Sequence, residues 1–210
     1  MTRILIADDH EVVRRGLKDL LADEYPKVKI GEARNFQEVI ALADKQPWDV
    51  VLLDINMPGR SGLEILAELK RLHPKLPILM LSAFPEQDYA LRSLKLGAAG
   101  YLNKETASEE LLAAIKKALA GGKYVTASLA EKLASSVGDQ TAGKPHESLS
   151  NRELQVLRMI ASGKSIKEIG ADLSLSEKTV GTYRMRISEK MHLSTNVELT
   201  RYALQHRLVD

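Results

Sequence analysis

Short apolar runs alternate with amphipathic stretches over the first half of the chain. The runs lie at residues 3–7, 28–33, 49–53, 77–82 and 99–102, and stretches with helical periodicity follow at 11–22, 36–45, 61–72, 86–96 and 107–120. Five consecutive strand–helix units predict an α/β fold, a doubly wound sheet of five parallel strands. The runs 3–7, 49–53 and 77–82 are continuously apolar, as interior parallel strands are, whereas 28–33 is more polar and is expected nearer an edge.

The rest of the chain predicts a different architecture. Helical patterns occur at 151–162, 165–173, 177–191 and 197–206, with no strand, so we expect a small all-α domain of four helices at 146–210. Residues 1–123 form the α/β domain, and residues 124–145 are a linker with a short helix near 127–137. Ser174-Leu175-Ser176 separates the second and third helices by the spacing of a helix-turn-helix.

Composition excludes several classes of protein. The 210 residues are 44% hydrophobic and 28% charged, as in soluble proteins. The absence of cysteine excludes disulfides and a thiolate zinc site. Because no apolar run reaches a membrane span of about 18 residues and no signal-peptide pattern opens the chain, we expect a cytoplasmic protein with no membrane partner. The net charge of +2 lies within residues 145–210, which alone is weak evidence for nucleic-acid binding.

Acidic residues follow two of the predicted strands. Asp8 and Asp9 come after the run 4–7, and Asp54 comes after the run 50–53. If these are neighbouring parallel strands, their carboxyl ends bring the three carboxylates to one edge of the sheet, where open α/β sheets bind ligands. Clustered carboxylates require a cation, and oxygen ligands suit Mg²⁺. The pattern therefore indicates phosphoryl transfer onto a carboxylate.

Residues 1–123 resemble the receiver domain of two-component response regulators, a flavodoxin-like fold. The motifs are the Asp8-Asp9 pair and the segments 54–59, 81–83 and 100–104. The resemblance implies that a sensor histidine kinase or phosphotransfer protein phosphorylates Asp54. It implies that Mg²⁺ is bound by Asp9, Asp54 and the backbone carbonyl of Asn56, with Asp8 contributing mostly through water.

Three further residues complete the site that this resemblance implies. Lys104, after the fifth strand, supplies an ammonium that offsets the charge of the transferring phosphoryl group. Ser82, at the end of the fourth strand, can donate its hydroxyl to a phosphoryl oxygen. Tyr101 takes the role of a rotating switch residue. Taken singly, these residues could instead be a solvated lysine, a strand-end hydroxyl and a packed aromatic.

Residues 146–210 resemble the helix-turn-helix domain of NarL/LuxR/FixJ regulators. The match runs through the segments 149–157, 163–170 and 175–180, and the segments 178–187 and 196–200 look most like the GacA/UvrY group. The resemblance implies binding to double-stranded DNA. We expect a homodimer, because two recognition helices can then read successive major grooves. The last helix is a candidate pairing surface, although closing its own core is the simpler role.

The third helix of this domain is expected to read DNA. At about 100° per residue, one face carries Val180, Tyr183, Ile187 and Met191 and is predicted to meet the core. Of the outward residues, we expect Lys178, Thr182 and Met185 to contact bases, and Thr179 and Arg186 to contact phosphates. Arg184 lies near the core face. Many family members carry lysine where this chain has Gly181 and histidine at Tyr183, so their operators cannot be transferred to this protein.

Two alternatives compete with a phosphorylation-controlled transcription factor. A haloacid-dehalogenase-like phosphatase also uses a strand-end aspartate with Mg²⁺, but it needs Asp-x-Asp, and Asp54 is followed by Ile55-Asn56. We therefore expect no enzyme beyond self-phosphotransfer and autodephosphorylation. The second alternative is a constitutive DNA-binding protein whose receiver serves only for dimerisation.

Overall fold

A computed structural model describes the chain except for residues 58–59, 84–85, 105–106, 132–143, 207 and 210. The chain divides into two compact units, Met1–Gly138 and Asp139–Asp210. Of the helix expected near 127–137, residues 127–131 are helical, and 132–137 lie outside the described residues.

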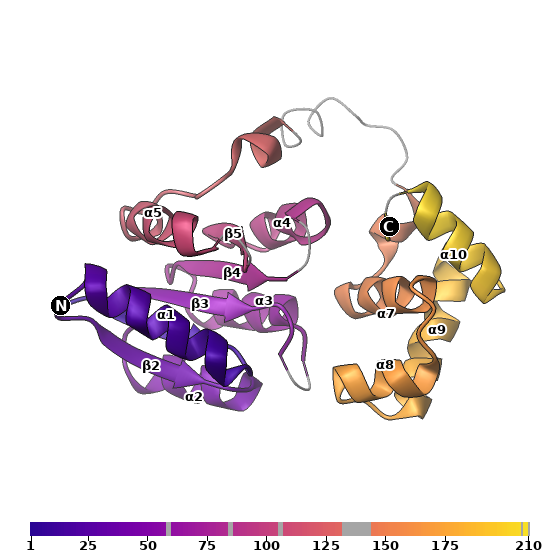
Figure 1. The fold of residues 1–210 in the computed structure, drawn as a ribbon, viewed down its shortest axis with the longest axis horizontal. Helices are drawn as coiled ribbons and strands as arrows, with labels where there is room; N and C mark the ends of the chain where they lie inside the picture. The colour runs from indigo at the N-terminus through magenta and orange to yellow at the C-terminus, as the bar shows by residue number, and fades with distance from the viewer. Residues whose placement is uncertain (58–59, 84–85, 105–106, 132–143, 207, 210) are drawn as a thin grey trace. The chain divides into compact units, whose positions relative to one another are not determined.

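The first unit contains the predicted parallel sheet (Figure 1). Its strands are β1 (Arg3–Ala7), β2 (Lys29–Ala33), β3 (Val50–Asp54), β4 (Ile78–Ser82) and β5 (Gly100–Asn103). Their order is β2-β1-β3-β4-β5, so β1 and β3 are neighbours and the polar strand β2 lies at an edge, as expected. The five-stranded doubly wound fold is therefore confirmed.

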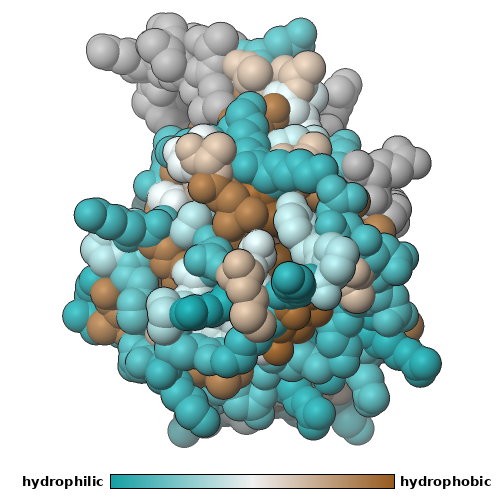
Figure 2. All heavy atoms as spheres, turned by 90° about the vertical axis from the view of Figure 1, so that its left-hand side faces the viewer, coloured by the Kyte–Doolittle hydropathy of each residue, from teal (hydrophilic) through white to brown (hydrophobic). Residues whose placement is uncertain are grey.

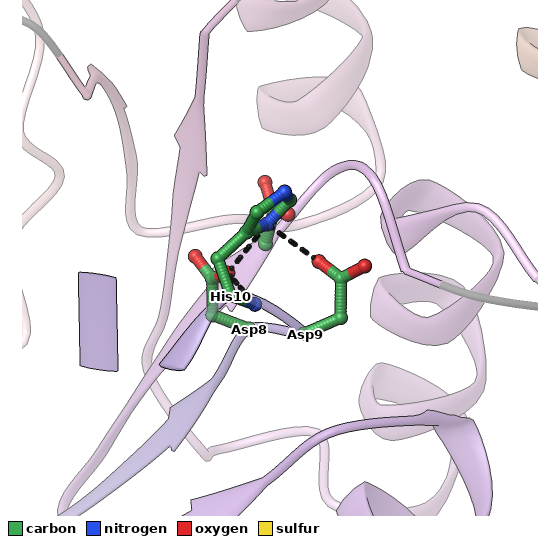
Figure 3. Close-up of side chains that lie close together, drawn as sticks. Asp8, Asp9 and His10 are labelled. Atoms are coloured by element: carbon green, nitrogen blue, oxygen red, sulfur yellow. Dashed lines mark hydrogen bonds and ion pairs between the residues drawn. The ribbon is translucent and has the colours of Figure 1, made fainter. Parts of the chain in front are cut away.

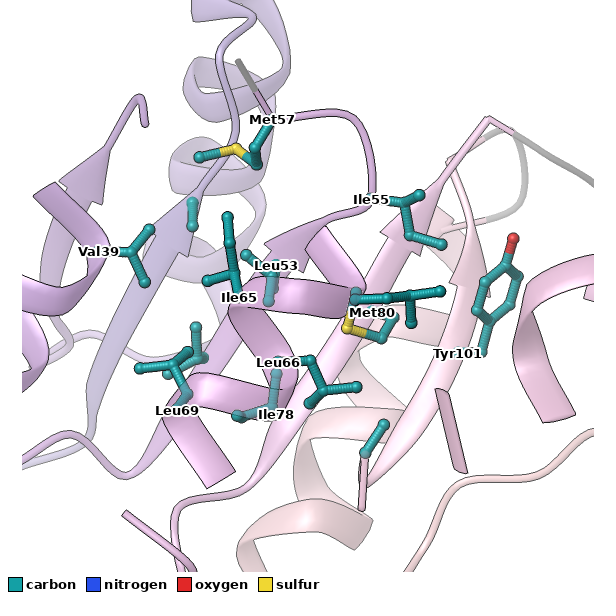
Figure 4. Close-up of a cluster of buried hydrophobic side chains, with 14 of the residues drawn as sticks. Val39, Leu53, Ile55, Met57, Ile65, Leu66, Leu69, Ile78, Met80 and Tyr101 are labelled. Atoms are coloured by element: carbon teal, nitrogen blue, oxygen red, sulfur yellow. The ribbon is translucent and has the colours of Figure 1, made fainter. Parts of the chain in front are cut away.

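Helices cover both faces of this sheet. The cluster of buried side chains on one face includes residues of α2 (Phe36–Lys45), α3 (Gly62–Leu72) and α4 (Glu86–Lys95). The cluster on the other face includes residues of α1 (Glu11–Glu24) and α5 (Ala107–Leu119). Strand residues alternate between the clusters, because successive side chains of a strand point to opposite faces. Leu53, Met80 and Tyr101 belong to the first cluster, which Figure 4 shows.

The N-terminal ends of the strands present an apolar surface. Figure 2 shows apolar residues gathered near the centre of the face that lies at the left of Figure 1. A shallow pocket at this end of the unit is lined by Trp48, Leu76 and Leu119, among others. The acidic residues follow the opposite ends of the strands, so these two regions of the first unit are separate.

The second unit is all helical in its described residues. A short 3₁₀ turn, η1 (Pro145–Ser148), precedes α7 (Asn151–Ala161), α8 (Ile166–Leu173), α9 (Glu177–Met191) and α10 (Asn196–Gln205). The turn was not predicted, whereas the four helices were. Each helix begins at a hydroxyl side chain that accepts a backbone N–H three residues later; these are Ser150, Ser165, Ser176 and Thr195. Among the described helices, none is long and apolar enough to cross a bilayer.

Candidate functional site

Three carboxylates converge at the carboxyl edge of the sheet. Ala7 of β1 pairs with Leu53 of β3, so Asp8 and Asp54 follow at adjacent positions. One ligand atom from each of Asp8, Asp9, His10 and Asp54 can be chosen so that all lie within 4.8 Å of one another. The predicted meeting of the aspartates is confirmed, and the structure adds a histidine to the group.

Lys104 reaches the same point from β5. Its backbone N–H donates to the carbonyl of Ser82 at 2.7 Å, which ties the end of β5 to the end of β4. The ammonium then lies 2.7 Å from Asp8 Oδ2 and 3.0 Å from Asp54 Oδ1. Ser82 is buried at the end of β4, the strand beside β3. Ser82 and Lys104 therefore occupy the edge of the sheet that the sequence predicted.

Burial governs the electrostatics of this edge. Asp54 is only 1% exposed. Loss of hydration, opposed by Lys104 and reinforced by the nearby Asp8, raises the pKa of its carboxyl to about 6. Burial would lower the pKa of Lys104, but the attraction of Asp54 and Asp8 outweighs it and leaves that pKa above its ordinary value. Lys104 thus remains an ammonium between two carboxylates.

One oxygen of this group is without a partner. Oδ2 of Asp54 is buried and accepts no hydrogen bond from the described residues. A buried, unsatisfied acceptor carries a desolvation cost of about 1–3 kcal/mol, more when charged. This oxygen lies beside two further acidic side chains, and a bound cation would satisfy it.

Arg14 is a buried arginine that the sequence analysis did not identify. From α1, its Nη1 donates to the backbone carbonyl of Asp8 at 2.8 Å and its Nε to Glu32 of β2 at 3.1 Å. The guanidinium therefore fixes the end of β1 next to the acidic pair. A signal was available, because Arg14 stands in the inward stripe of α1 with Leu17 and Leu21, where a charged residue needs a buried partner.

His10 is a second residue of this edge that the sequence did not single out. Its backbone N–H donates to Asp8 Oδ1 at 2.8 Å. Its ring nitrogen Nδ1 lies 2.8 Å from Asp9 Oδ1 and 3.3 Å from Asp8 Oδ1 (Figure 3). Its place directly after two clustered acids was the feature that could have indicated a role.

The chain after β3 is shaped by a close approach. A Cβ on Gly62, the first residue of α3, would overlap the backbone carbonyl oxygen of Asp54, and the Gly62 N–H donates to Ile55 at 2.7 Å. Only glycine allows α3 to begin this near the aspartate. Asn56, the predicted carbonyl ligand, is half-buried in this connection. Pro58, also in the predicted motif segment, lies outside the described residues.

Tyr101 is buried in β5, two per cent exposed. Figure 4 shows its ring at one end of the apolar cluster, near Ile55 and Met80. Tyr101 thus lies on the strand that leads to Lys104, and it packs in the same cluster as Ile55, which follows Asp54.

The second unit contains the predicted helix-turn-helix in α8 and α9. The N–H of Leu175 donates to the carbonyl of Gly170 at 2.8 Å, and Ser174 adopts a left-handed conformation with φ of 54°. A Cβ on Gly170 would come 2.8 Å from the carbonyl oxygen of Leu175. The turn therefore requires glycine at this position of α8.

The predicted orientation of α9 is confirmed. Val180, Ile187 and Met191 are buried, and Tyr183 packs partly buried against the same cluster. Arg184 hydrogen-bonds to the segment at the start of α10. Its guanidinium donates to the Asn196 side chain at 2.8 Å and to the Ser194 carbonyl at 3.1 Å, and so links α9 to the start of α10.

The outward face of α9 presents the predicted DNA-contacting residues. Lys178 and Arg186 are exposed, and Met185 is 53% exposed. Thr182 is half-buried, and its hydroxyl donates to the Lys178 carbonyl at 3.0 Å, which leaves its methyl group and oxygen lone pairs for a partner. The Thr179 hydroxyl lies 2.8 Å from the hydroxyl of Ser176, the N-cap residue of α9, and the two form a hydrogen bond.

Helix α10 combines an inner and an outer face. Leu199 is buried and Tyr202 packs against the core of the unit, so the helix closes that core as expected. Val197 and Leu204 remain 76% and 50% exposed. They line a groove with Ile160, Thr200 and Arg201 among its other residues.

Comparison with known proteins supports both halves of this description. Residues 4–116 match the response regulator receiver domain, and residues 147–203 match the luxR family of bacterial regulatory proteins. The response regulator GacA of Pseudomonas aeruginosa is 38% identical over 211 residues, covering 100% of this chain and 99% of the relative. The response regulator UvrY of Escherichia coli K12 is 36% identical, covering 100% and 97%.

Solved structures of the response regulator RcsB align with this chain. RcsB from Salmonella enterica serovar Typhimurium, bound to the promoter rprA in the presence of a phosphomimetic, aligns with a TM-score of 0.62 at 26% identity, covering 96% of this chain and 98% of that one. Another structure contains two RcsB dimers bound to two parallel DNAs, with a TM-score of 0.59. The resemblance found in the sequence is confirmed: this chain belongs to the response regulators, with a receiver domain followed by a LuxR-type DNA-binding domain.

Proposed function

We propose that phosphorylation of Asp54 by a sensor histidine kinase or phosphotransfer protein controls DNA binding by the second unit. The observation that carries this proposal is the buried Asp54 carboxylate, with one oxygen paired to Lys104 and the other without a hydrogen-bond partner among the described residues. In the reaction, an Asp54 oxygen forms a bond to phosphorus as the P–N bond of the phosphohistidine breaks, and the electron pair leaves with the imidazole. Asp54 must be ionised to do this.

The side chains around Asp54 fit a divalent cation. Asp9 and Asp54, with the carbonyl of Asn56, would hold Mg²⁺, and Asp8 would act mostly through water. The fit is supported by ligand atoms that lie within 4.8 Å of one another and by the unsatisfied Oδ2 of Asp54. Bound Mg²⁺ supplies positive charge that lets an anionic donor approach a carboxylate.

Other residues complete the acceptor site. Lys104 shifts its ion pair from the carboxylates to the incoming phosphoryl group, and the Ser82 hydroxyl donates to a phosphoryl oxygen. Both are held by the strand ends, so they need little reorganisation. Nothing in this set provides a second acid after Asp54, which supports an acceptor that receives one phosphoryl group over a phosphatase that turns over external substrates.

DNA is bound by α9, with Lys178, Thr182 and Met185 against base edges and Thr179 and Arg186 against phosphates. The protein acts as a homodimer, so that two copies of α9 meet successive major grooves. The RcsB dimers on DNA support this assembly for a related protein.

Incubation of the full chain with acetyl phosphate tests the acceptor. With Mg²⁺ we expect intact mass to increase by one phosphoryl group, and no increase with EDTA or in Asp54→Asn. DNA affinity is then measured with and without phosphorylation. Absence of the adduct would refute the phosphorylation model and leave the constitutive regulator, in which the receiver serves only for dimerisation. An adduct without change in DNA affinity would refute the proposed control.

A further inference from the structure

The chain that follows α5 continues along the edge of the receiver sheet. Tyr124 pairs in parallel with Gly100 of β5, the last strand in the sheet order, and the Tyr124 N–H donates to the Ala99 carbonyl at 2.6 Å. A Cβ on Gly100 would come 2.9 Å from the Tyr124 Cβ, so glycine permits this close approach. The Tyr124 side chain packs partly buried against the cluster that includes residues of α1 and α5. Tyr124 is therefore a fixed point of the chain.

Residues 125–131, the docked segment, pack on the other face of the sheet. The Val125 side chain is partly buried against the cluster of Figure 4, and Leu129 is a buried member of that cluster, 2% exposed. The Thr126 hydroxyl accepts the Leu129 N–H at 3.2 Å and precedes a short helical stretch, residues 127–131. Every other residue of that stretch is exposed. Val125 and Leu129 are thus the large apolar side chains that hold the segment on this face.

The cluster that contains Leu129 also contains Tyr101, and both side chains are 2% exposed. Tyr101 lies on β5, three residues before Lys104, whose ammonium is 3.0 Å from Asp54 Oδ1. Strand β5 therefore leads to the acceptor site at its carboxyl end and pairs with Tyr124 at its amino end. Because protein interiors are close-packed, a rearrangement of a β5 side chain changes the space that Leu129 can occupy.

The docking of this segment is weak enough to be reversed. Full burial of one leucine favours a docked over a free arrangement by about 10- to 150-fold. An allosteric effector typically changes an equilibrium by about 5- to 150-fold, which is the same range. A helical stretch as short as residues 127–131 is not stable without its tertiary contacts. Loss of the Leu129 contact would therefore release the whole segment.

We propose that the docked segment carries the receiver's signal to the DNA-binding unit: it lies on the sheet in the unphosphorylated chain and is released when Asp54 carries a phosphoryl group. Tyr124 stays paired with β5 and serves as the hinge. Release lengthens the free connection between the two units, so that two second units can pair on DNA. The proposal rests on the proposed function, and it adds the segment through which phosphorylation acts.

The absence of cysteine from the chain allows a direct test, because Leu129→Cys introduces a single thiol at the buried position. The rate of its reaction with N-ethylmaleimide in the full chain reports the exposure of position 129. Leu69→Cys is the matched control, since Leu69 is fully buried in the same cluster and lies across it from Tyr101 in Figure 4. Beryllium fluoride with Mg²⁺, which mimics a phosphoryl group on aspartate, should accelerate labelling of Leu129→Cys about tenfold and leave that of Leu69→Cys unchanged.

A charge at position 129 should mimic release. We expect Leu129→Asp to raise basal affinity for a DNA duplex with two half-sites about tenfold and to leave little further increase with beryllium fluoride. Ser128→Asp is the control, because Ser128 is an exposed neighbour in the same stretch and receives the same charge. It should keep the wild-type basal affinity and the full increase. Urea unfolding followed by Trp48 fluorescence verifies that both variants retain a folded receiver.

The outcomes separate this proposal from the proposed function. Suppose that acetyl phosphate adds a phosphoryl group to Asp54 and DNA affinity rises. Unchanged labelling of Leu129→Cys, equal acceleration in Leu69→Cys, or wild-type basal affinity in Leu129→Asp then overturns the release of the segment and leaves the proposed function in place. If Asp54 acquires no phosphoryl group, the proposed function fails and this proposal fails with it.

Discussion

At the scale of single residues, Asp54 has a stability cost that its function explains. Its folded pKa of about 6 exceeds the unfolded value near 4, so the native state binds this proton more tightly. The contribution of the carboxyl to stability is therefore complete below about pH 4 and is lost as the pH rises through about 6. Above that pH, the buried charge costs up to about 3 kcal/mol without metal.

We therefore expect Asp54→Asn to raise the free energy of unfolding in EDTA at pH 7.5, by up to about 3 kcal/mol, and by less at pH 5. Urea unfolding followed by Trp48 fluorescence measures this free energy of unfolding in the wild type and the variant. Trp48 is the only tryptophan of the chain and is buried in the receiver unit. Saturating Mg²⁺ should reduce the difference. An equal gain at both pH values would show that ionisation of Asp54 is not its cause.

Arg14 is expected to position Asp8. Arg14→Met removes a buried donor from the Asp8 carbonyl and from Glu32, and we expect a loss of about 2 kcal/mol in unfolding free energy together with weaker Mg²⁺ binding. Lys18→Met is the matched control, because Lys18 binds the same Glu32 from a more exposed position and should cost less than about 1 kcal/mol. Calorimetric titration with Mg²⁺ measures the Mg²⁺ affinity of both variants. Equal Mg²⁺ affinity in both variants would contradict a positioning role.

At the scale of elements, two glycines of the DNA-binding unit offer a matched comparison. Gly170→Ala adds a methyl group against the Leu175 carbonyl and should destabilise the unit by about 1–3 kcal/mol. Gly181→Ala adds the same group to α9 in open space and should stabilise it by up to about 1 kcal/mol. Thermal unfolding by circular dichroism, with Trp48 reporting the receiver separately, measures both. Similar changes in thermal stability in both variants would refute the close contact between position 170 and the Leu175 carbonyl.

The outward face of α9 gives a prediction about specificity. Lys178→Ala and Thr182→Ala should change which sequences are preferred, whereas Arg186→Ala should weaken binding to all sequences and lower the salt slope by about one. Selection from a randomised DNA pool, followed by salt titrations, separates these effects. Uniform loss in all three variants would contradict the assignment of base-reading residues.

The same elements show what the sequence could predict. Periodicity located the strands and helices, and strand ends located Asp8, Asp54, Ser82 and Lys104, because each depends on short-range pattern and parallel topology. The partners of Arg14 lie on β2 and at the end of β1, so its inward position on α1 could single it out but could not name them. His10 contacts its sequence neighbours Asp8 and Asp9, and its place after them was the local feature that could have indicated a role. The η1 turn was missed for a related reason, since its four residues are too few to give a periodic signal.

At the scale of the whole molecule, phosphorylation can control DNA binding only if it favours one of two receiver states. Tyr101 is the residue best placed to distinguish them, because it is buried in β5 three residues before Lys104 and packs in the cluster that contains Ile55. We expect Tyr101→Ala to accept a phosphoryl group and to keep basal DNA affinity, but to lose most of an affinity increase that we place at about tenfold.

Titration of a DNA duplex with two half-sites, with and without beryllium fluoride and Mg²⁺, measures this coupling in the full chain. Tyr124→Ala is the control, because Tyr124 is a partly buried aromatic packed against the cluster on the opposite face of the sheet. If both variants lose the increase equally, the effect reflects general loosening of the receiver. If Tyr101→Ala keeps the full increase, then the conformational signal leaves Asp54 by a route that does not pass through β5.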